Sequence, residues 1–173
     1  MPVKKGGGGK PQEYDPSNGR YGSGSIGTIS KTFGPQPQGP KVLTRSLLRK
    51  KRLDERAANS EDPLLPDVYN NIQTWVCGCV MKVNEKYYLS PGHNGEIDIE
   101  TRHLVIEVKS GTARHFVKQF TQEAAYAKIR NKEFIVFAPN MSQTRKNLAR
   151  KLGFNVVSTD RELKEIIIRK EGK

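Results

Sequence analysis

The spacing of apolar residues divides the chain near residue 41. Residues 1–40 show almost no periodic apolar pattern, and they contain ten of the sixteen glycines and six of the ten prolines. A segment of this composition buries little apolar surface, which predicts a disordered tail or linker. From residue 41 onward apolar residues recur at regular intervals, so we expect one folded domain over residues 41–173.

Apolar residues follow helix-type and strand-type spacings in alternation along residues 41–173. Apolar residues that recur every three or four positions predict helices over residues 42–58, 67–75, 113–130, 142–152 and 160–169. Shorter apolar runs predict strands over residues 76–83 paired with 87–90, then 95–99, 104–109, 134–138 and 154–157. Thr159 or Asp160 is expected to cap the last helix, and Gly153 to stop the one before it. The order αβββαβαβα indicates an α/β fold in which helices flank a mixed central β-sheet.

A β-hairpin is predicted where the runs 95–99 and 104–109 follow each other. If its turn is centred on residues 101 and 102, Glu96 lies opposite Glu107. Asp98 and Glu107 are then diagonal neighbours on one face of the hairpin. The register therefore predicts two carboxylates close together on adjacent strands.

The residues around this pair suggest a metal site. Because strand side chains alternate between faces, Glu107 and Lys109 are expected on one face, and Ile106 and Val108 on the core side. Diagonal carboxylates lie roughly 7–8 Å apart at the backbone, a span that one or two hard cations bridge. Without a cation the two charges would repel, so the pairing of Asp98 with Glu107 predicts bound Mg²⁺, or Mn²⁺ in its place. A solvated hairpin edge is the alternative.

Such a centre has the groups that phosphodiester hydrolysis requires. A cation held by Asp98 and Glu107 would act as a Lewis acid. Lys109 would hold the attacking water in line, or help to deprotonate it if the cation lowers the lysine pKa. Glu96 is either an auxiliary ligand, a partner for Lys109 or a solvated side chain.

The helix expected over residues 113–130 has two contrasting sides. Its packed side contains Phe116, Phe120, Ala124 and Ala127. Its other side contains, at four-residue intervals, Arg114, Lys118, Gln122 and Tyr126. Cationic and hydrogen-bonding side chains beside a metal site suit a phosphate backbone, and a tyrosine can stack on a base. A solvated helix face is the alternative.

These residues resemble a known family. Asp98, followed by Glu107-Val108-Lys109 at the end of an apolar strand, looks like the core motif of the PD-(D/E)XK, or restriction-endonuclease-like, nuclease superfamily. Gln122 and Tyr126 match the Gln-xxx-Tyr pattern of its RecB-type branch. The resemblance implies a Mg²⁺-dependent endonuclease with Asp98, Glu107, Lys109 and Gln122 as catalytic residues, on a mixed sheet flanked by helices.

The resemblance is incomplete upstream of the hairpin. Family members usually have another acidic residue on a preceding helix, and Glu55, Glu61 and Asp67 all qualify by position. The proline of the family name is replaced by Ile97. A His-dependent nuclease is a further alternative, because the chain contains three histidines. They are His93, which Asn94 follows, His103 and His115.

Charge supports a nucleic-acid partner. The chain has 30 Lys and Arg against 18 Asp and Glu, a net charge of +12, which predicts attraction to polyanions and salt-sensitive binding. Residues 1–60 account for +8 of this charge, much of it on the helix expected over residues 42–58. That basic helix face could contact nucleic acid or anionic lipid. No apolar run is long enough to span a membrane.

The tail offers one more comparison. Residues 9–21 look like the linker ahead of the C-terminal toxin domains of bacterial polymorphic toxins and related phage structural proteins. This resemblance implies the effector of a bacterial competition system, delivered as part of a larger secreted toxin, acting in the bacterial cytoplasm and opposed by an immunity protein. A repair nuclease, a Holliday-junction resolvase or a non-catalytic nucleic-acid-binding module are the alternatives. DNA or RNA is a possible substrate in each case.

Overall fold

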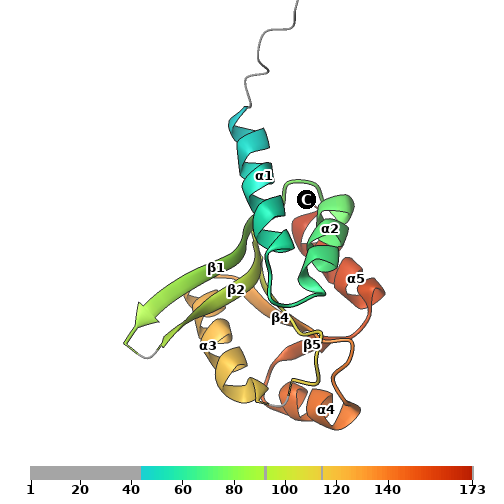
Figure 1. Ribbon diagram of the computed structural model, residues 1–173. Helices are drawn as coiled ribbons and strands as arrows, with labels where there is room; N and C mark the ends of the chain where they lie inside the picture. Colours follow the sequence, from blue (N-terminus) through green and yellow to red (C-terminus); the bar gives the residue numbers. More distant parts are fainter. Residues whose placement is uncertain (1–43, 92, 114, 173) are drawn as a thin grey trace, which may run out of the picture. The chain divides into compact units, whose positions relative to one another are not determined.

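The computed structural model describes residues 44–91, 93–113 and 115–172 (Figure 1). The tail expected over residues 1–40 and Arg114 of the expected cationic stripe lie outside the described residues. The helices are α1 (Arg45–Ala58), α2 (Leu65–Trp75), α3 (Phe116–Ile129), α4 (Gln143–Lys151) and α5 (Asp160–Glu171). The strands are β1 (Val80–Ser90), β2 (His93–Thr101), β3 (Leu104–Val108), β4 (Glu133–Phe137) and β5 (Asn155–Val157).

The strands form one mixed sheet in the order β1-β2-β3-β4-β5. The pairs β1–β2 and β2–β3 are antiparallel, whereas β3–β4 and β4–β5 are parallel. The α/β class with a mixed sheet flanked by helices is therefore confirmed. Two helices precede β1, as the spacings over residues 42–58 and 67–75 predict, so the element order is ααβββαβαβα and the order αβββαβαβα is one helix short.

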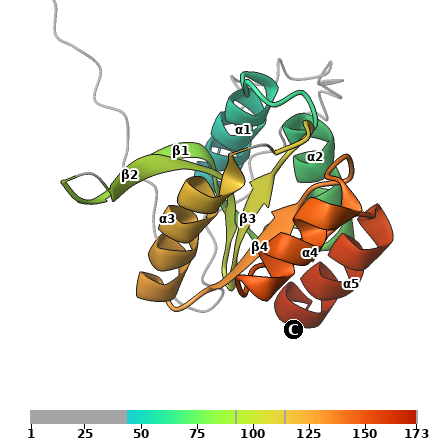
Figure 2. The same ribbon diagram turned by 90° about the horizontal axis from the view of Figure 1, so that it is seen from below.

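Helices cover both faces of the sheet (Figure 2). Helices α1, α2 and α5 pack on one face, where the core includes Leu53, Ile72 and Leu163 against Ile99, Ile106 and Ile135. Helices α3 and α4 pack on the other face, where Phe120 and Ala149 meet Val136 and Val156. Strand β4 supplies buried side chains to both faces, which accounts for the continuous apolar run over residues 134–138.

The prediction of a strand pair over residues 76–83 and 87–90 is wrong. One continuous strand, β1, covers Val80–Ser90 and pairs with β2 over its length. The polar segment Asn84-Glu85-Lys86 suggested a turn, but Glu85 and Lys86 instead pair with Ile97 and Glu96. Polar side chains are tolerated there because this part of the β1–β2 hairpin, the arm in Figure 1, extends beyond β3.

The expected register of the β2–β3 hairpin is also wrong. The paired residues are Ile99 with Ile106 and Glu100 with Val105, two positions from the expected alignment. The turn is centred on residues 102 and 103, because the Thr101 hydroxyl accepts a hydrogen bond from the Leu104 N–H at 3.0 Å and closes it. Continued by one residue, this register sets Asp98 directly opposite Glu107 rather than diagonal to it.

In the part of the chain that the structure describes, no helix has both the length and the apolar character that a membrane span requires. This agrees with the absence of a long apolar run in the sequence.

Candidate functional site

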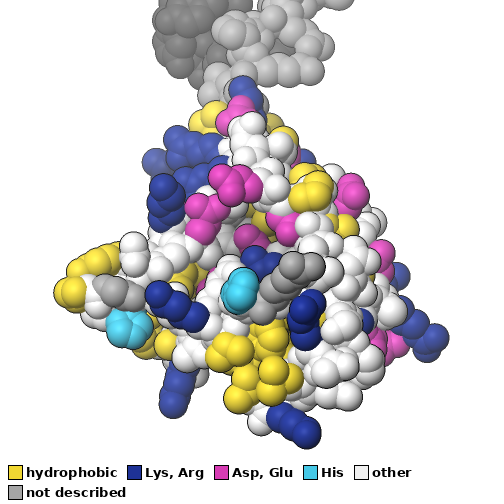
Figure 3. All heavy atoms as spheres, turned by 60° about the horizontal axis from the view of Figure 1, so that its bottom comes forward, with side chains coloured by type: hydrophobic (Ala, Val, Ile, Leu, Met, Phe, Trp, Pro, Cys, Tyr) yellow, Lys and Arg dark blue, Asp and Glu magenta, His cyan; other side chains and the backbone are white. Residues whose placement is uncertain are grey.

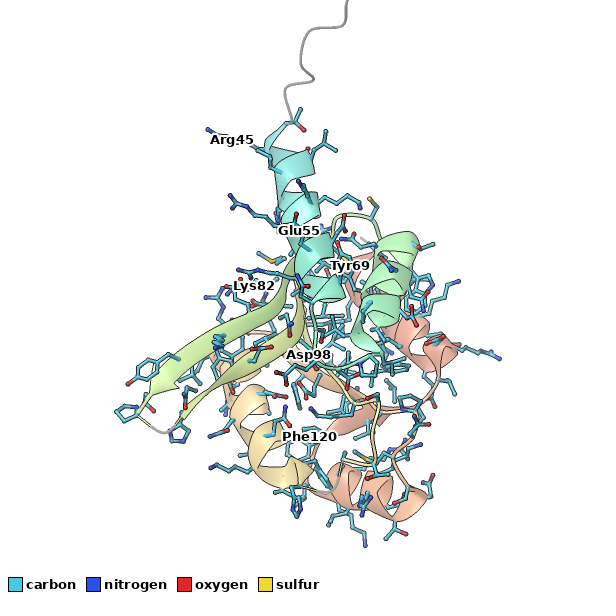
Figure 4. The ribbon with its side chains drawn as sticks, in the orientation of Figure 1. Arg45, Glu55, Tyr69, Lys82, Asp98 and Phe120 are labelled. Carbon is cyan, nitrogen blue, oxygen red and sulfur yellow. The ribbon has the colours of Figure 1, made fainter. Side chains whose placement is uncertain are left out.

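A cavity of about 420 Å³ opens where α3, the end of β3, the β1–β2 hairpin and the loop between α1 and α2 meet. Most of its lining is polar, and Asp98, Lys109 and Gln122 of the predicted site contribute to it. Figure 4 shows the Asp98 side chain between the end of α1 and the helix α3. The structure therefore brings three of the four expected catalytic residues to one cavity, with Glu107 directly behind them.

Asp98 lies where β2 separates from β3. Its Oδ2 accepts a hydrogen bond from the Val108 N–H at 2.7 Å, in place of a further backbone pair of the ladder. Burial, and then the charge of Glu107, raise the pKa of Asp98 to about 8. One carboxylate thus ends the strand pairing and faces a second negative group.

Glu107 and Lys109 form a close ion pair on the same face of β3, as expected. The Lys109 Nζ lies 2.5 Å from Oε1 of Glu107, whose residue is only 1% exposed. Burial, and then the charge of Glu123, raise the pKa of Glu107 to about 8. Burial lowers the pKa of Lys109, but Glu107 outweighs this effect and the net pKa is raised. These contacts favour the charged form of Lys109.

Sequence reasoning missed two residues of the site, Gln119 and Glu123, on the inward side of α3. The Gln119 Nε2 donates to Oε1 of Glu107 at 2.7 Å and to Oε1 of Glu123 at 2.9 Å. Glu123 is 2% exposed, and its Oε2 is buried without a hydrogen-bond partner. Burial, with a contribution from the charge of Asp98, raises the pKa of Glu123 to about 7. The carboxyl groups of Asp98 and Glu123 therefore line this cavity, and the buried Glu107 carboxyl is hydrogen-bonded to that of Glu123.

The loop between α1 and α2 supplies one wall of the cavity. Asp62, also missed from the sequence, accepts hydrogen bonds at its Oδ2 from the Ser110 N–H at 3.0 Å and the Ser110 hydroxyl at 3.1 Å. This contact fixes the loop against the residues that follow β3, and Glu61 lines the cavity beside it. Of the three upstream acids, only Glu61 does so. Glu55 pairs with Lys51, and Asp67 lines a different cavity.

The polar side chains expected along one side of α3 do not share one exposed surface. Lys118 is exposed, and Gln122 is half-buried in the cavity lining. Tyr126 is buried, and its hydroxyl donates to Oε2 of Glu100 at 2.8 Å. Its ring lies 4.7 Å from the ring of Tyr87. The prediction of a shared exposed face is wrong, and the Tyr126 ring has no open side on which a base could stack.

The remaining polar candidates lie around the site rather than in it. Glu96 is exposed at the edge of the cavity and pairs across the hairpin with Lys86, not with Glu107. His93, His103 and His115 are exposed at the hairpin tip, in the β2–β3 turn and before α3, and none of them lines the cavity. The geometry thus gives no support to a His-dependent centre.

The chemistry of the three carboxyl groups suits a hard divalent cation such as Mg²⁺ or Mn²⁺. Over residues 44–91, 93–113 and 115–172, no three His, Cys, Asp or Glu side chains are arranged as a ready ligand set. Lys109 and Gln119 occupy Oε1 of Glu107 instead. A cation would have to compete with these groups.

Comparisons of the chain with protein families, with curated proteins and with solved structures found no match.

Proposed function

We propose that this chain is a divalent-cation-dependent nuclease that hydrolyses phosphodiester bonds in DNA or RNA, as its resemblance to the PD-(D/E)XK superfamily implies. The observation that carries the proposal is that Asp98 and Lys109 line one cavity, with the Lys109 ammonium 2.5 Å from the carboxylate of the buried Glu107. Buried carboxyl groups with raised pKa values are more typical of functional sites than of a solvated hairpin edge.

Each residue has a distinct role in this proposal. Asp98 and Glu107 hold the cation, Mg²⁺ or Mn²⁺, which supplies the Lewis acid that polarises the phosphoryl group. Lys109 is protonated, so it positions the attacking water or stabilises negative charge on a phosphate oxygen. Gln122 reaches the same cavity from α3 and donates to phosphate or water. Glu61 is the upstream acid that the family pattern requires.

Exposed basic side chains support a polyanionic substrate. Figure 3 shows basic and acidic side chains interspersed on the face that it brings forward. Lys118 is exposed on α3 and is a possible phosphate contact. The proposed role of the chain as a toxin, with a cognate immunity protein and action in the bacterial cytoplasm, rests on residues 9–21 alone.

The test is cleavage of plasmid DNA and of structured RNA with Mg²⁺, with Mn²⁺ and with EDTA. Asp98→Asn and Lys109→Met are expected to lower the rate by about 10²- to 10⁴-fold, since each removes a group that contacts the reacting centre. Asp67→Asn and Lys164→Met are matched controls, because they make the same changes at exposed positions outside the cavity. Glu61→Gln is expected to lower the rate where Asp67→Asn does not.

Two outcomes would overturn this function. Cleavage that survives both Asp98→Asn and Lys109→Met would show that the site is assigned incorrectly. Tight binding of nucleic acid, without cleavage under any metal, would favour a non-catalytic binding module.

A further inference from the structure

The β1–β2 hairpin brings to the cavity a tyrosine that the proposed nuclease mechanism does not use. Tyr87 of β1 lines the cavity and pairs across the hairpin with Gly95 of β2. The residue is 8% exposed, and it belongs to an apolar cluster with Ile97 and Tyr126. Its ring therefore has a packing role, but packing does not require the hydroxyl that the ring carries.

The hydroxyl of Tyr87 has no hydrogen-bond partner among the described residues. The neighbouring Tyr126 differs in this respect. Its ring lies 4.7 Å from that of Tyr87, and its hydroxyl donates to Oε2 of Glu100 at 2.8 Å. A largely buried tyrosine usually finds such a partner in the protein. The Tyr87 hydroxyl is thus available to a molecule that enters the cavity.

Gly95 allows the Tyr87 ring to lie across β2. A Cβ atom at position 95 would lie 2.8 Å from the Tyr87 hydroxyl oxygen and 2.9 Å from two carbons of its ring, which is closer than such atoms pack. A larger residue at position 95 would therefore displace the ring and its hydroxyl. Because Gly95 also lines the cavity, the cross-strand pair fixes the hydroxyl beside the space that a substrate would occupy.

The surroundings keep this hydroxyl a hydrogen-bond donor. Burial, and then the charges of Glu123 and Glu107, raise the pKa of Tyr87 to about 12, so the group keeps its proton. Lys109 and Gln122, whose side chains also carry N–H donors, line the same cavity. Donors that converge on one cavity suit the oxygen atoms of a phosphate group.

We propose that Tyr87 is a substrate-binding residue, and that its hydroxyl donates a hydrogen bond to a phosphate oxygen of the nucleic acid. This inference rests on the proposed nuclease function. A neutral donor suits this position, because a lysine or arginine beside the acids would form an ion pair with one of them, as Lys109 does with Glu107. The phenol instead remains available to the substrate.

Three tyrosine-to-phenylalanine variants of the full chain test the contact, because each removes one hydroxyl and keeps its ring. Tyr87→Phe removes the proposed contact. Tyr88→Phe is the control on the same strand, since Tyr88 is 68% exposed and does not line the cavity. Tyr126→Phe is the control for a structural hydroxyl. Affinity for duplex DNA and for structured RNA is measured with Mg²⁺ in the Lys109→Met background, in which cleavage should be slow and the carboxyl groups remain.

Tyr87→Phe should lower the affinity for at least one of these nucleic acids about 10-fold, the effect of losing one hydrogen bond to a charged group. Tyr88→Phe should leave both affinities unchanged. Without the Lys109→Met change, Tyr87→Phe should keep the wild-type thermal midpoint, because its hydroxyl has no partner in the fold, whereas Tyr126→Phe should lower the midpoint. Gly95→Ala should also weaken binding, because it displaces the ring.

The outcomes separate this contact from the nuclease function. If Tyr87→Phe leaves both affinities unchanged, or lowers the thermal midpoint as much as Tyr126→Phe does, the inference is wrong, whether or not the wild-type chain cleaves nucleic acid. If Tyr87→Phe weakens binding as expected but the wild-type chain cleaves neither DNA nor RNA with any metal, the phosphate contact stands and the nuclease function fails.

Discussion

At the scale of single residues, the site is shaped by acids that are held close together without enough positive charge. The pKa values of Asp98 and Glu107 are raised to about 8, and that of Glu123 to about 7. Lys109 compensates only part of the negative charge, and the polar Gln119 none of it. The residues that we propose to bind a cation therefore make the cation-free protein less stable at neutral and alkaline pH.

The Asp98→Asn variant should reveal this loss of stability when EDTA keeps the protein free of cations. Between the unfolded pKa of 3.8 and the folded pKa of about 8, the native wild-type protein binds a proton that the unfolded chain lacks, so its stability falls as pH rises through this window. Asparagine has no such proton, and its amide oxygen can still accept from the Val108 N–H. The thermal midpoint of the variant minus that of wild type should therefore increase by several degrees from pH 5 to pH 8. An unchanged difference would show that Asp98 is ionised throughout.

Glu123 also shows why residue-level prediction was incomplete. The apolar spacing of Phe116 and Phe120 identified the packed side of α3 correctly, but a buried glutamate contradicts the hydrophobic pattern on which that reasoning depends. The only sequence signal was a Gln119–Glu123 pair at i,i+4 on the border of the apolar side. Asp62 gave no signal at all, because its partner Ser110 is 48 residues away.

At the scale of elements, hydrophobic spacing predicted most helices and strands, and local caps defined some of their ends. Thr159, one of the two expected caps, caps α5 and forms a full capping box with Glu162. The β2–β3 register was wrong by two positions, because the pattern does not specify where a turn falls. A shift of two residues keeps every side chain on its original face. For this reason Glu107 and Lys109 were predicted on the correct face with the wrong opposite neighbour.

A buried ionic network joins the hairpin to the elements behind it. Glu100 of β2 is fully buried, and its carboxylate contacts the Nζ of Lys132 at 2.5 Å and the hydroxyl of Tyr126 at 2.8 Å. Burial raises the pKa of Glu100, but the hydrogen bonds from Lys132 and Tyr126 outweigh it and the net pKa is lowered. This network explains why Tyr126 is buried and not on the surface.

Lys132→Met should destabilise the fold by about 3 kcal/mol at pH 7, because it leaves a buried charge without its closest partner. A group with a lowered folded pKa contributes stability above its unfolded pKa and loses it as pH falls through the folded pKa. The difference in free energy of unfolding between the variant and wild type should therefore shrink below about pH 4. Urea unfolding at pH 7 and pH 3.5 measures the free energy of unfolding of the variant and of wild type. The exposed Lys128→Met substitution is the control. An equal difference at both pH values would contradict an ionic role.

At the scale of the whole molecule, the basic residues of α1 and the cavity lie in different regions. The chain has a net charge of +12, yet the cavity itself is lined by several acids. Exposed basic residues of α1, such as Arg45 and Arg52, lie on another part of the molecule. Attraction of a polyanion and chemistry on it would then be carried out by different regions.

Salt dependence tests this division. In the full-length Asp98→Asn protein, the logarithm of affinity for duplex DNA should fall linearly with the logarithm of salt concentration. Arg45→Gln with Arg52→Gln should reduce that slope by about 1 to 2, one counterion for each lost phosphate contact. Substituting the exposed pair Arg161 and Lys164 of α5 is the control. If the α1 and α5 variants reduce the slope of the salt dependence equally, the basic face of α1 is not a specific contact region.

The hydrogen bond from the Val108 N–H to Asp98 has a consequence for how this chain can change over evolution. The same carboxylate stops β3 from pairing further with β2 and, in the proposed site, holds the cation at the resulting opening. Substitutions at position 98 therefore alter folding and chemistry together. A descendant that lost the activity would be under pressure to retain an acceptor here, so an asparagine or aspartate at this position would persist after the lysine and glutamates had drifted.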